Sequence, residues 1–290
     1  MAEQMQGIKR RIKSINSTER ITNAMKLVSA AKLRHAKSIF TNTQEYLSRL
    51  IDTISETFEH VENVPEHFLD GSRKIKTKCF VVITSSSGLC GSFNGNVLRF
   101  AESQLRALDE SELDVKLVTV GAKGRTYLEH RGYAVLAEHD APADSMTFDE
   151  AAEISNNLIA LYLSGEIDEI DIIYTSYINT LKQEVKVKRL LPFDVNAIQG
   201  KDKFSHPVDY GPSPEAVFAY LVPKYIEMNL YRTCIESATC EYAARRMAME
   251  NANENAKDML DSLETAYNRA RQSQITDQII EIVAGSEAQR

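Results

Sequence analysis

Apolar side chains recur in the C-terminal part of the chain at alternating steps of three and four residues. This seam has fourteen positions, and all but Arg245, Ser273 and Asp277 are apolar. The fourteen are Ile235, Ala238, Tyr242, Arg245, Met249, Ala252, Ala256, Met259, Leu263, Ala266, Ala270, Ser273, Asp277 and Ile280. A mean repeat of 3.5 residues is typical of a left-handed coiled coil. Ser213 and Pro214 predict the start of this helix, and Gly285 predicts its end.

The N-terminal part carries a second, less regular helical pattern. Its apolar positions are Ile8, Ile12, Ile15, Ile21, Met25, Val28, Leu47, Ile51, Ile54, Phe58 and Val61. Residues 8–64 and 224–284 contain neither glycine nor proline. Helices this long need a long partner, and the simplest partner is the other end of the same chain. We therefore expect an antiparallel coiled coil; two separate intermolecular coiled coils are the alternative.

The middle of the chain alternates the signals of strands and helices. Strands are expected at residues 78–84, 115–120, 134–137, 169–177 and 184–190, and helices at 96–108, 123–130 and 148–163. This alternation predicts an open, mainly parallel Rossmann-like α/β sheet with helices on its faces, and the last two strands are a candidate hairpin. The predicted domains are an N-terminal coiled-coil helix (1–64), an α/β domain (65–212) and a C-terminal coiled-coil helix (213–290).

Charge is distributed unevenly along the chain. The formal net charge is −7 over 290 residues, yet the first forty residues hold nine basic and two acidic side chains. Lys9, Arg10, Arg11 and Lys13 begin this basic face. Such a face suits nucleic acid, an anionic membrane or an acidic protein, or is simply a solvated flank. No aromatic residue precedes Phe40, which counts against stacking on single-stranded nucleic acid.

Composition excludes several other classes. The four cysteines form neither a disulfide framework nor a CxxC metal pair, so a reducing compartment is expected. No apolar run approaches the length of a membrane span, and the N-terminus lacks the apolar core of a signal peptide. Asp168, Glu169 and Asp171 are expected to solvate the ends of a strand. No spacing of histidines or carboxylates indicates a catalytic or metal site.

The glycine-containing stretch 85–95 follows the first predicted strand, where phosphate-binding loops lie. It contains Gly88, Leu89, Cys90 and Gly91 but has neither GxGxxG nor GxxxxGK[ST] spacing. Cys90 has no histidine nearby in the sequence to activate it as a nucleophile. We therefore favour a tight turn that packs a helix against a strand over a nucleotide site.

Motifs at both ends of the chain and in this loop are highly specific. They are IKRRIKSI (8–15), ITNAMKLVSAAKLR (21–34), GLCG (88–91), EYAARRMAM (241–249), YNRARQSQIT (267–276) and EIVAG (281–285). The chain closely resembles, over its whole length, the gamma subunit of bacterial F-type ATP synthase.

This resemblance implies a rotor shaft. Its paired terminal helices would turn inside a ring of three alpha and three beta subunits. The α/β domain would form the foot, against the epsilon subunit and the membrane c-ring. Proton flow would drive the rotation that couples to ATP synthesis or hydrolysis. The chain would have no active site and no cofactor of its own, since ATP, ADP and Mg²⁺ belong to alpha and beta. It would lie peripherally at the cytoplasmic face of the bacterial plasma membrane.

The resemblance also assigns roles to individual residues. Met25 matches the family's coupling methionine, and Lys26 follows it directly. Arg271, Gln272 and Thr276 match a segment that touches a beta loop. Arg245 matches a family arginine, and its burial in the seam would need a partner.

The chain departs from the family pattern in places. Ser86 and Ser87 replace the usual Asp-Arg before the GLCG motif, and Tyr210–Pro214 lacks the usual glutamate before Pro-x-Pro. The cysteine-bearing insertion of chloroplast forms is absent, which argues against thiol control of that type. Two alternatives to the rotor remain. One is a nucleotide-binding α/β enzyme with helical dimerisation arms, and the other is a nucleic-acid-binding coiled coil.

Overall fold

A computed structural model describes residues 2–62, 74–109, 113–143, 145–193 and 208–287. The chain forms two compact units. One combines residues 1–30 with 245–290, and the other comprises residues 31–244. The predicted domain division at residue 64 lies outside the described residues, and the whole predicted division stays a prediction.

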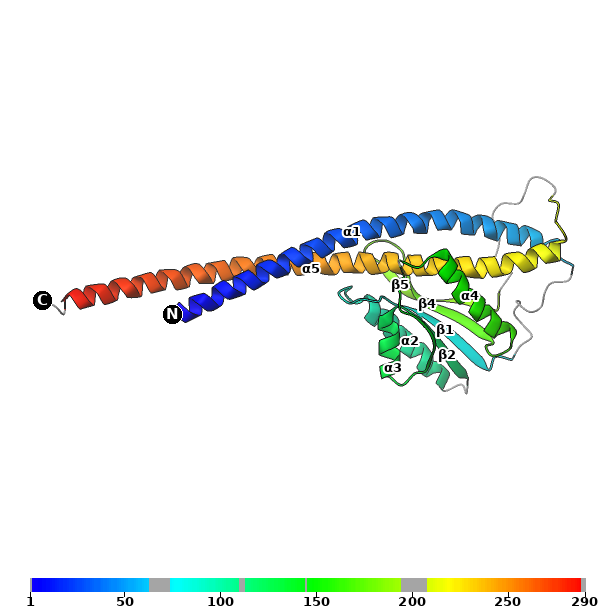
Figure 1. The fold of residues 1–290 in the computed structure, drawn as a ribbon, viewed down its shortest axis with the longest axis horizontal. Helices are drawn as coiled ribbons and strands as arrows, with labels where there is room; N and C mark the ends of the chain where they lie inside the picture. The colour runs from blue at the N-terminus through cyan, green and yellow to red at the C-terminus, as the bar shows by residue number, and fades with distance from the viewer. Residues whose placement is uncertain (1, 63–73, 110–112, 144, 194–207, 288–290) are drawn as a thin grey trace. The chain divides into compact units, whose positions relative to one another are not determined.

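The larger unit contains a five-stranded sheet of β1 (Thr77–Ile83), β2 (Asp114–Val120), β3 (Val135–His139), β4 (Glu169–Tyr177) and β5 (Gln183–Leu191) (Figure 1). The strand order is β3-β2-β1-β4-β5. The first four strands are parallel neighbours, whereas β4 and β5 pair antiparallel. The predicted open sheet and its terminal hairpin are therefore confirmed.

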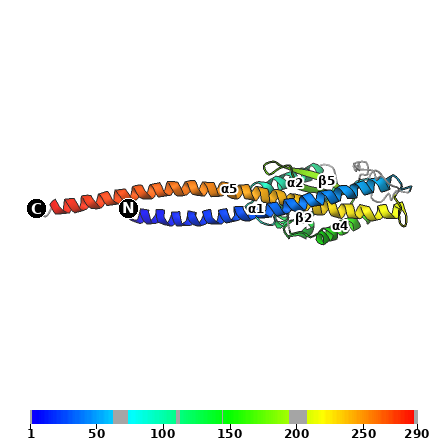
Figure 2. The same cartoon turned by 90° about the horizontal axis from the view of Figure 1, so that it is seen from above.

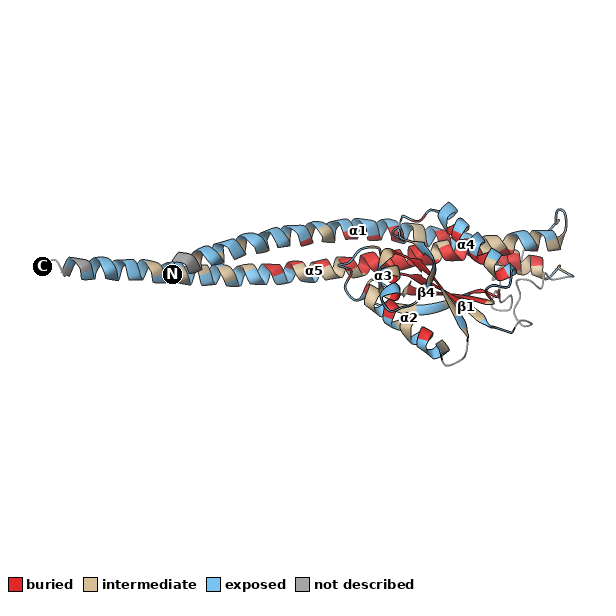
Figure 3. Ribbon diagram, turned by 60° about the horizontal axis from the view of Figure 1, so that its bottom comes forward, coloured by how far each residue is buried: buried red, intermediate tan, exposed pale blue. Residues whose placement is uncertain are grey.

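Alternate side chains of the strands pack into two separate layers, as the pleat of a sheet requires. Phe80 and Val82 of β1 face α2 (Phe93–Asp109) and α3 (Ala122–His130). Cys79 and Val81, one residue out of phase, pack into a second core. That core combines α4 (Phe148–Leu163) with buried residues from the long helices α1 and α5. In Figure 3 buried residues are seen on the strands of the sheet, on α4 and on the part of α5 beside them.

The two long helices are α1 (Ala2–Phe58) and α5 (Pro214–Glu287), and in each unit they run antiparallel. In the smaller unit Lys9 lies over the Tyr267 ring, and Glu19 is bonded to Asn253. In the larger unit Lys32 donates to Tyr242, and Phe58 packs on Phe218. In both units, α1 residues with higher numbers contact α5 residues with lower numbers, as antiparallel helices require. The pairing of the chain's own ends is confirmed, against the intermolecular alternative.

The inward face of α1 follows a regular alternation of three and four residues that its apolar pattern does not reveal. All positions at this spacing are buried or half-buried: Met5, Ile8, Ile12, Ile15, Glu19, Thr22, Lys26, Ser29, Leu33, Ala36, Phe40, Thr43, Leu47, Leu50, Ile54 and Thr57. Four consecutive members, from Glu19 to Ser29, are polar. The prediction that Ile21 and Val28 lie on the seam is therefore wrong, because both are exposed.

The seam predicted on α5 is only half correct in the smaller unit. Met249, Ala256, Leu263 and Ala270 lie on the less exposed face as predicted, but Met259, Ala266 and Ser273 are exposed. Leu260, Tyr267 and Gln274 turn inward in their place. The less exposed positions keep the same mean repeat of 3.5 residues, but the step of four comes before the step of three: Met249, Asn253, Ala256, Leu260, Leu263, Tyr267, Ala270 and Gln274. The predicted seam therefore has the right period, but every second position falls one residue short of the inward side chain.

A network of four charges, two of them buried carboxylates, lies on β1, β4 and β5. Lys78 Nζ is 2.5 Å from Glu169 Oε1 and 2.6 Å from Asp171 Oδ2. Arg189 Nη2 is 2.7 Å from Glu169 Oε2, and its Nε is 3.3 Å from Asp171 Oδ1. Each carboxylate residue is only 3% exposed. The expectation that these acids solvate a strand end is therefore wrong: they are desolvated and neutralised across neighbouring strands.

Candidate functional site

The described residues show neither a metal-ligating cluster nor a membrane-spanning helix. No group of three or more histidine, cysteine or carboxylate residues within them is placed to hold a metal ion. Among these same residues, no helix is long and apolar enough to cross a membrane. The candidate functional site is therefore sought on the surfaces of the two long helices and the loops beside them.

The first candidate surface is the outward face of α1 near its middle. Ile21, Leu27 and Val28 are 57%, 62% and 57% exposed, although each is a large apolar side chain. The inward face beside them is polar: Thr22 Oγ1 donates to the Glu19 carbonyl, and Ser29 Oγ donates to Met25. The usual arrangement of an amphipathic helix is thus reversed over these residues. A surface of this kind indicates an interaction site.

The structure brings Met25 and Lys26 to the border of this surface. Both are half-buried, and Lys26 occupies an inward position of α1. The outward apolar residues were not recognised from the sequence as a surface, because Ile21 and Val28 were assigned to the seam. The signal that would have found them is the polar run Glu19, Thr22, Lys26 and Ser29 at regular heptad spacing.

The second candidate surface is the C-terminal part of α5. Arg271, Gln272 and Thr276 are all exposed, and the Thr276 hydroxyl donates to the Gln272 carbonyl at 3.0 Å. Five large apolar side chains beside or beyond them are also exposed: Ile275, Ile279, Ile280, Ile282 and Val283. In this unit α5 continues past the start of α1 (Figure 2). The extension therefore lacks cover from α1.

The remaining predicted residues of the smaller unit fall in different environments. Arg245 is 7% exposed, so this seam arginine is buried as its position requires. Lys9, Arg10, Arg11 and Lys13 are exposed, and Lys9 Nζ lies 5.5 Å from the centroid of the Tyr267 ring. Through this cation–π contact, one charge of the basic face interacts with a residue of the same chain.

The Gly88–Gly91 loop connects β1 to α2 and is held by hydrogen bonds of its own. Asn94 Oδ1 accepts from the Ser85 amide at 3.0 Å, and Asn94 Nδ2 donates to Ser85 Oγ and to Cys90 Sγ. Cys90 is buried against Phe93 and Cys240. These contacts fit the predicted tight turn, in which the thiol is part of the packing.

Leu89 is the unusual member of that loop. Its φ of 64° lies in the left-handed region, and its side chain is 62% exposed. This conformation costs a residue with a Cβ about 1–2 kcal/mol. An apolar side chain that is both strained and exposed is a candidate contact residue.

A polar cluster that sequence analysis missed joins α5 to the sheet in the larger unit. Glu236 Oε1 accepts from Ser176 Oγ and from the Tyr177 amide, each at 2.9 Å. Arg232 is 3.4 Å from the other oxygen of Glu236. Lys188 of β5 donates to Asn229 Oδ1 nearby. Burial, reinforced by the Arg232 charge, lowers the pKa of Lys188 to about 8.

Comparison with known proteins gives one consistent result. Residues 4–289 match the family model described as ATP synthase. The chain is 39% identical to the ATP synthase gamma chain of Alkaliphilus metalliredigens, with 98% of each chain covered. It is 35% identical to the sodium-ion-specific ATP synthase gamma chain of Acetobacterium woodii, with 99% of each covered. A chain of the Euglena gracilis mitochondrial ATP synthase shares the fold, with a TM-score of 0.67 and 18% identity, covering 99% of this chain and 95% of that one.

The fold and its surfaces first define a class: an open α/β sheet inserted between the two antiparallel helices of one chain, with exposed apolar surfaces on those helices. Within that class, the chain belongs to the ATP synthase gamma chain family, and the two gamma chains named above are from bacterial species. The family expected from the sequence motifs and the expected fold are both confirmed.

Proposed function

We propose that this chain is the central rotor stalk of an F-type ATP synthase. It couples ion flow through a membrane ring to ATP synthesis or hydrolysis at the beta subunits, by rotating inside the ring of alpha and beta subunits. The relative from Acetobacterium woodii named above is sodium-ion-specific in its description, whereas for this chain the coupling ion proposed from the family resemblance is the proton. The chain itself performs no bond chemistry and binds no cofactor, while ATP, ADP and Mg²⁺ are bound by alpha and beta.

One observation carries this proposal beyond family membership. Between Glu19 and Ser29 the inward face of α1 is polar, and Ile21, Leu27 and Val28 face outward. An apolar outer face on a helix that already has a partner is suited to a surrounding protein surface. Met25 and Lys26 lie at the border of that face, which supports their assignment as coupling residues.

The other proposed contacts follow from exposure and charge. Arg271, Gln272 and Thr276 contact a beta loop, together with the exposed apolar end of α5. The basic face of Lys9, Arg10, Arg11 and Lys13 faces acidic protein, not nucleic acid. Arg245 is a buried positioning residue of the helix pair. The Gly88–Gly91 loop is a contact of the foot domain, with Leu89 as its exposed side chain.

The proposed location is peripheral, at the cytoplasmic face of the bacterial plasma membrane. The chain reaches the membrane only through its complex. The epsilon subunit and the c-ring are the proposed partners of the α/β domain.

The decisive experiment changes the outward face of α1 without changing its inward face. The double variant Leu27→Ser/Val28→Ser should leave the free energy of unfolding of the isolated chain within about 0.5 kcal/mol of wild type, since both side chains are exposed. In the assembled ATP synthase in vesicles, it should reduce the ions pumped per ATP hydrolysed or weaken assembly. Val187→Ser, on the exposed edge strand β5, is the matched control.

The variant Met25→Lys adds a charge at the border of the same face. It should impair coupling more than assembly, because the desolvated surface must accept an additional cation. Wild-type pumping ratios and assembly in both the Leu27→Ser/Val28→Ser and Met25→Lys enzymes would contradict the proposed contact surface.

A further inference from the structure

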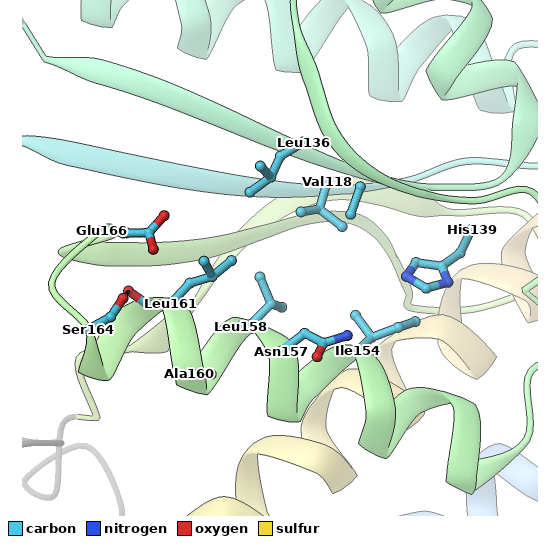
Figure 4. Close-up of a pocket in the computed structure, with 11 residues that line it drawn as sticks. Val118, Leu136, His139, Ile154, Asn157, Leu158, Ala160, Leu161, Ser164 and Glu166 are labelled. Carbon is cyan, nitrogen blue, oxygen red and sulfur yellow. Dashed lines mark hydrogen bonds between the residues drawn. The ribbon is translucent and has the colours of Figure 1, made fainter.

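A cleft of about 530 Å³ lies between α4 and the β2–β3 edge of the sheet, within the larger unit (Figure 4). β3 is an edge strand, and α4 covers the neighbouring part of this face. The side chain of Leu136 on β3 therefore remains 46% exposed. The volume lies in the range typical of small-molecule sites, about 300–1,000 Å³.

The walls of the cleft are apolar along their length. Val118 and Leu136 project from the strands, opposite Ile154, Leu158 and Leu161 on α4 (Figure 4). The lining residues on this side run along α4 from Ile154 to Ser164, the residue that caps the helix, which corresponds to about 15 Å. An elongated apolar molecule would therefore bury more surface here than a compact one.

Most polar groups lie at the two ends. His139 lies at one end and Ser164 and Glu166 at the other, while Asn157 lies on the α4 wall between Ile154 and Leu158 (Figure 4). Within the described part of the chain, the His139 ring and the Asn157 amide form no hydrogen bond with another residue. The His139 ring is half-buried and the Asn157 amide is exposed, so a hydroxyl or carbonyl head group near His139 would replace water as a partner of one or both.

The charges around the cleft are already matched. Glu166 is paired with Lys116 at 3.5 Å. Near the other end, Glu150 accepts hydrogen bonds from the backbone and hydroxyl of Thr147. These bonds, with a smaller contribution from the charge of His139, lower the pKa of Glu150. An anionic head group at His139 would face this carboxylate, and a cationic one at Glu166 would compete with Lys116.

We propose that this cleft binds an uncharged amphiphile. Its hydroxyl or carbonyl head group is bonded by His139 and Asn157, and its alkyl or isoprenoid chain lies between Leu136 and α4. The site is separate from the contact surfaces of the two long helices, so it adds a ligand-binding role that the rotor function does not require.

The absence of tryptophan from the sequence provides a clean probe. Leu136→Trp places one indole at the mouth of the cleft, and Val187→Trp places one on the opposite edge strand as a control. The purified full chain is titrated with n-decanol, decanoate and decyltrimethylammonium. We expect a saturable fluorescence change with n-decanol for Leu136→Trp alone. Removing two methylenes, in n-octanol, should weaken binding by about tenfold, and both charged probes should bind more weakly than n-decanol.

Two further variants test the location. Ala160 is exposed and lines the cleft, so Ala160→Phe should fill it without affecting folding and weaken binding by at least about tenfold. Asn156→Phe adds the same side chain to an exposed α4 position outside the cleft and should leave binding unchanged. Thermal shifts of the chain without introduced tryptophan provide a second readout.

Four results would overturn the proposal. The first is the absence of a saturable response to n-decanol in both fluorescence and thermal shift, and the second is an equal fluorescence response of Leu136→Trp and Val187→Trp. The third is tighter binding of decanoate or decyltrimethylammonium than of n-decanol. The fourth is an equal effect of Ala160→Phe and Asn156→Phe on n-decanol binding. If n-decanol binds the isolated chain but not the assembled enzyme, a partner polypeptide covers the cleft and the ligand-binding role is likewise rejected. None of these results bears on the coupling measured with the α1 variants.

Discussion

The side-chain amide of Asn253 in α5 is hydrogen-bonded to two oxygens of Glu19 in α1. Asn253 Nδ2 donates to the backbone carbonyl of Glu19 at 3.0 Å and to its carboxylate at 2.9 Å. Asn253 is buried, whereas Glu19 is half-buried. A buried amide at a seam position fixes the register of two helices, because sliding by one turn leaves it unpaired.

Asn253→Ala should therefore destabilise the chain by about 1–3 kcal/mol, since both oxygens of Glu19 lose a donor. Chemical unfolding followed by circular dichroism measures this change. Asn255→Ala, an exposed position on the same helix, is the matched control and should change stability by less than about 0.5 kcal/mol. Equal effects of the two substitutions would exclude a role of the Asn253 amide in the pairing.

The Lys78 network predicts a larger effect. Lys78→Met leaves Glu169 and Asp171 buried with only Arg189 as a cation, so a loss of about 3–5 kcal/mol is expected. Lys76→Met removes an exposed lysine two residues earlier and should be nearly neutral. In the double variant Lys78→Met/Asp171→Asn one uncompensated charge is removed, and part of the lost stability should return. Additive losses in the double variant would show that the charges act independently.

Lys188 predicts a dependence of stability on pH. Its pKa is about 8 in the folded chain against an ordinary 10.5. The folded state therefore releases this proton first, and stability rises as the pH increases from about 8 to 10.5. The burial cost present below pH 8 amounts to up to about 3 kcal/mol.

Buried thiols act in the opposite direction, because burial raises the pKa of Cys79 and of Cys234 to about 12 each. Their ionisation in the unfolded chain lowers stability above pH 9. The useful quantity is therefore the difference in unfolding free energy between wild type and Lys188→Met. It should shift in favour of wild type between pH 7 and 10. The exposed Lys186→Met variant should show no such trend, and a constant difference for Lys188→Met would refute the lowered pKa.

Gly121 and Gly132 allow the cost of a steric clash to be distinguished from the cost of a positive φ. Gly121 and Gly132 have similar φ values of 94° and 84°. A Cβ at Gly121 would lie 2.2 Å from the Thr84 carbonyl oxygen, whereas one at Gly132 meets nothing within 4 Å. Gly132→Ala should cost about 1–2 kcal/mol from its φ alone. Gly121→Ala should cost clearly more in the same thermal unfolding assay, and equal losses would mean that the β2–α3 turn can move away from β1.

The α/β sheet was predictable from sequence because its strands are short apolar runs separated by turns. KCFVVIT and EIDIIYTSY lie in β1 and β4 essentially where expected. The buried carboxylates were misassigned because sequence does not reveal which residues become strand neighbours. Lys78 and Arg189 approach Glu169 and Asp171 only through the β1–β4 and β4–β5 registers.

The candidate surfaces were only partly predictable for a related reason. Apolar residues of a helix indicate that it has a partner, but not whether the partner belongs to the same chain. Ile21 and Val28 were assigned to the seam on hydrophobicity, while the structure turns Thr22 and Ser29 inward. The motifs identified the family without resolving this orientation.

The polar inner face of α1 links folding to assembly. From Glu19 to Ser29 the two helices share little apolar contact, while Ile21, Leu27 and Val28 remain uncovered. A surface that covers those three side chains binds the folded chain and not the unfolded one, and so stabilises the folded state by mass action. A surface bound to the outer face of α1 therefore stabilises a segment in which the contact between the two helices is polar. This segment has little apolar contact of its own, and for that reason its stability depends on the bound surface.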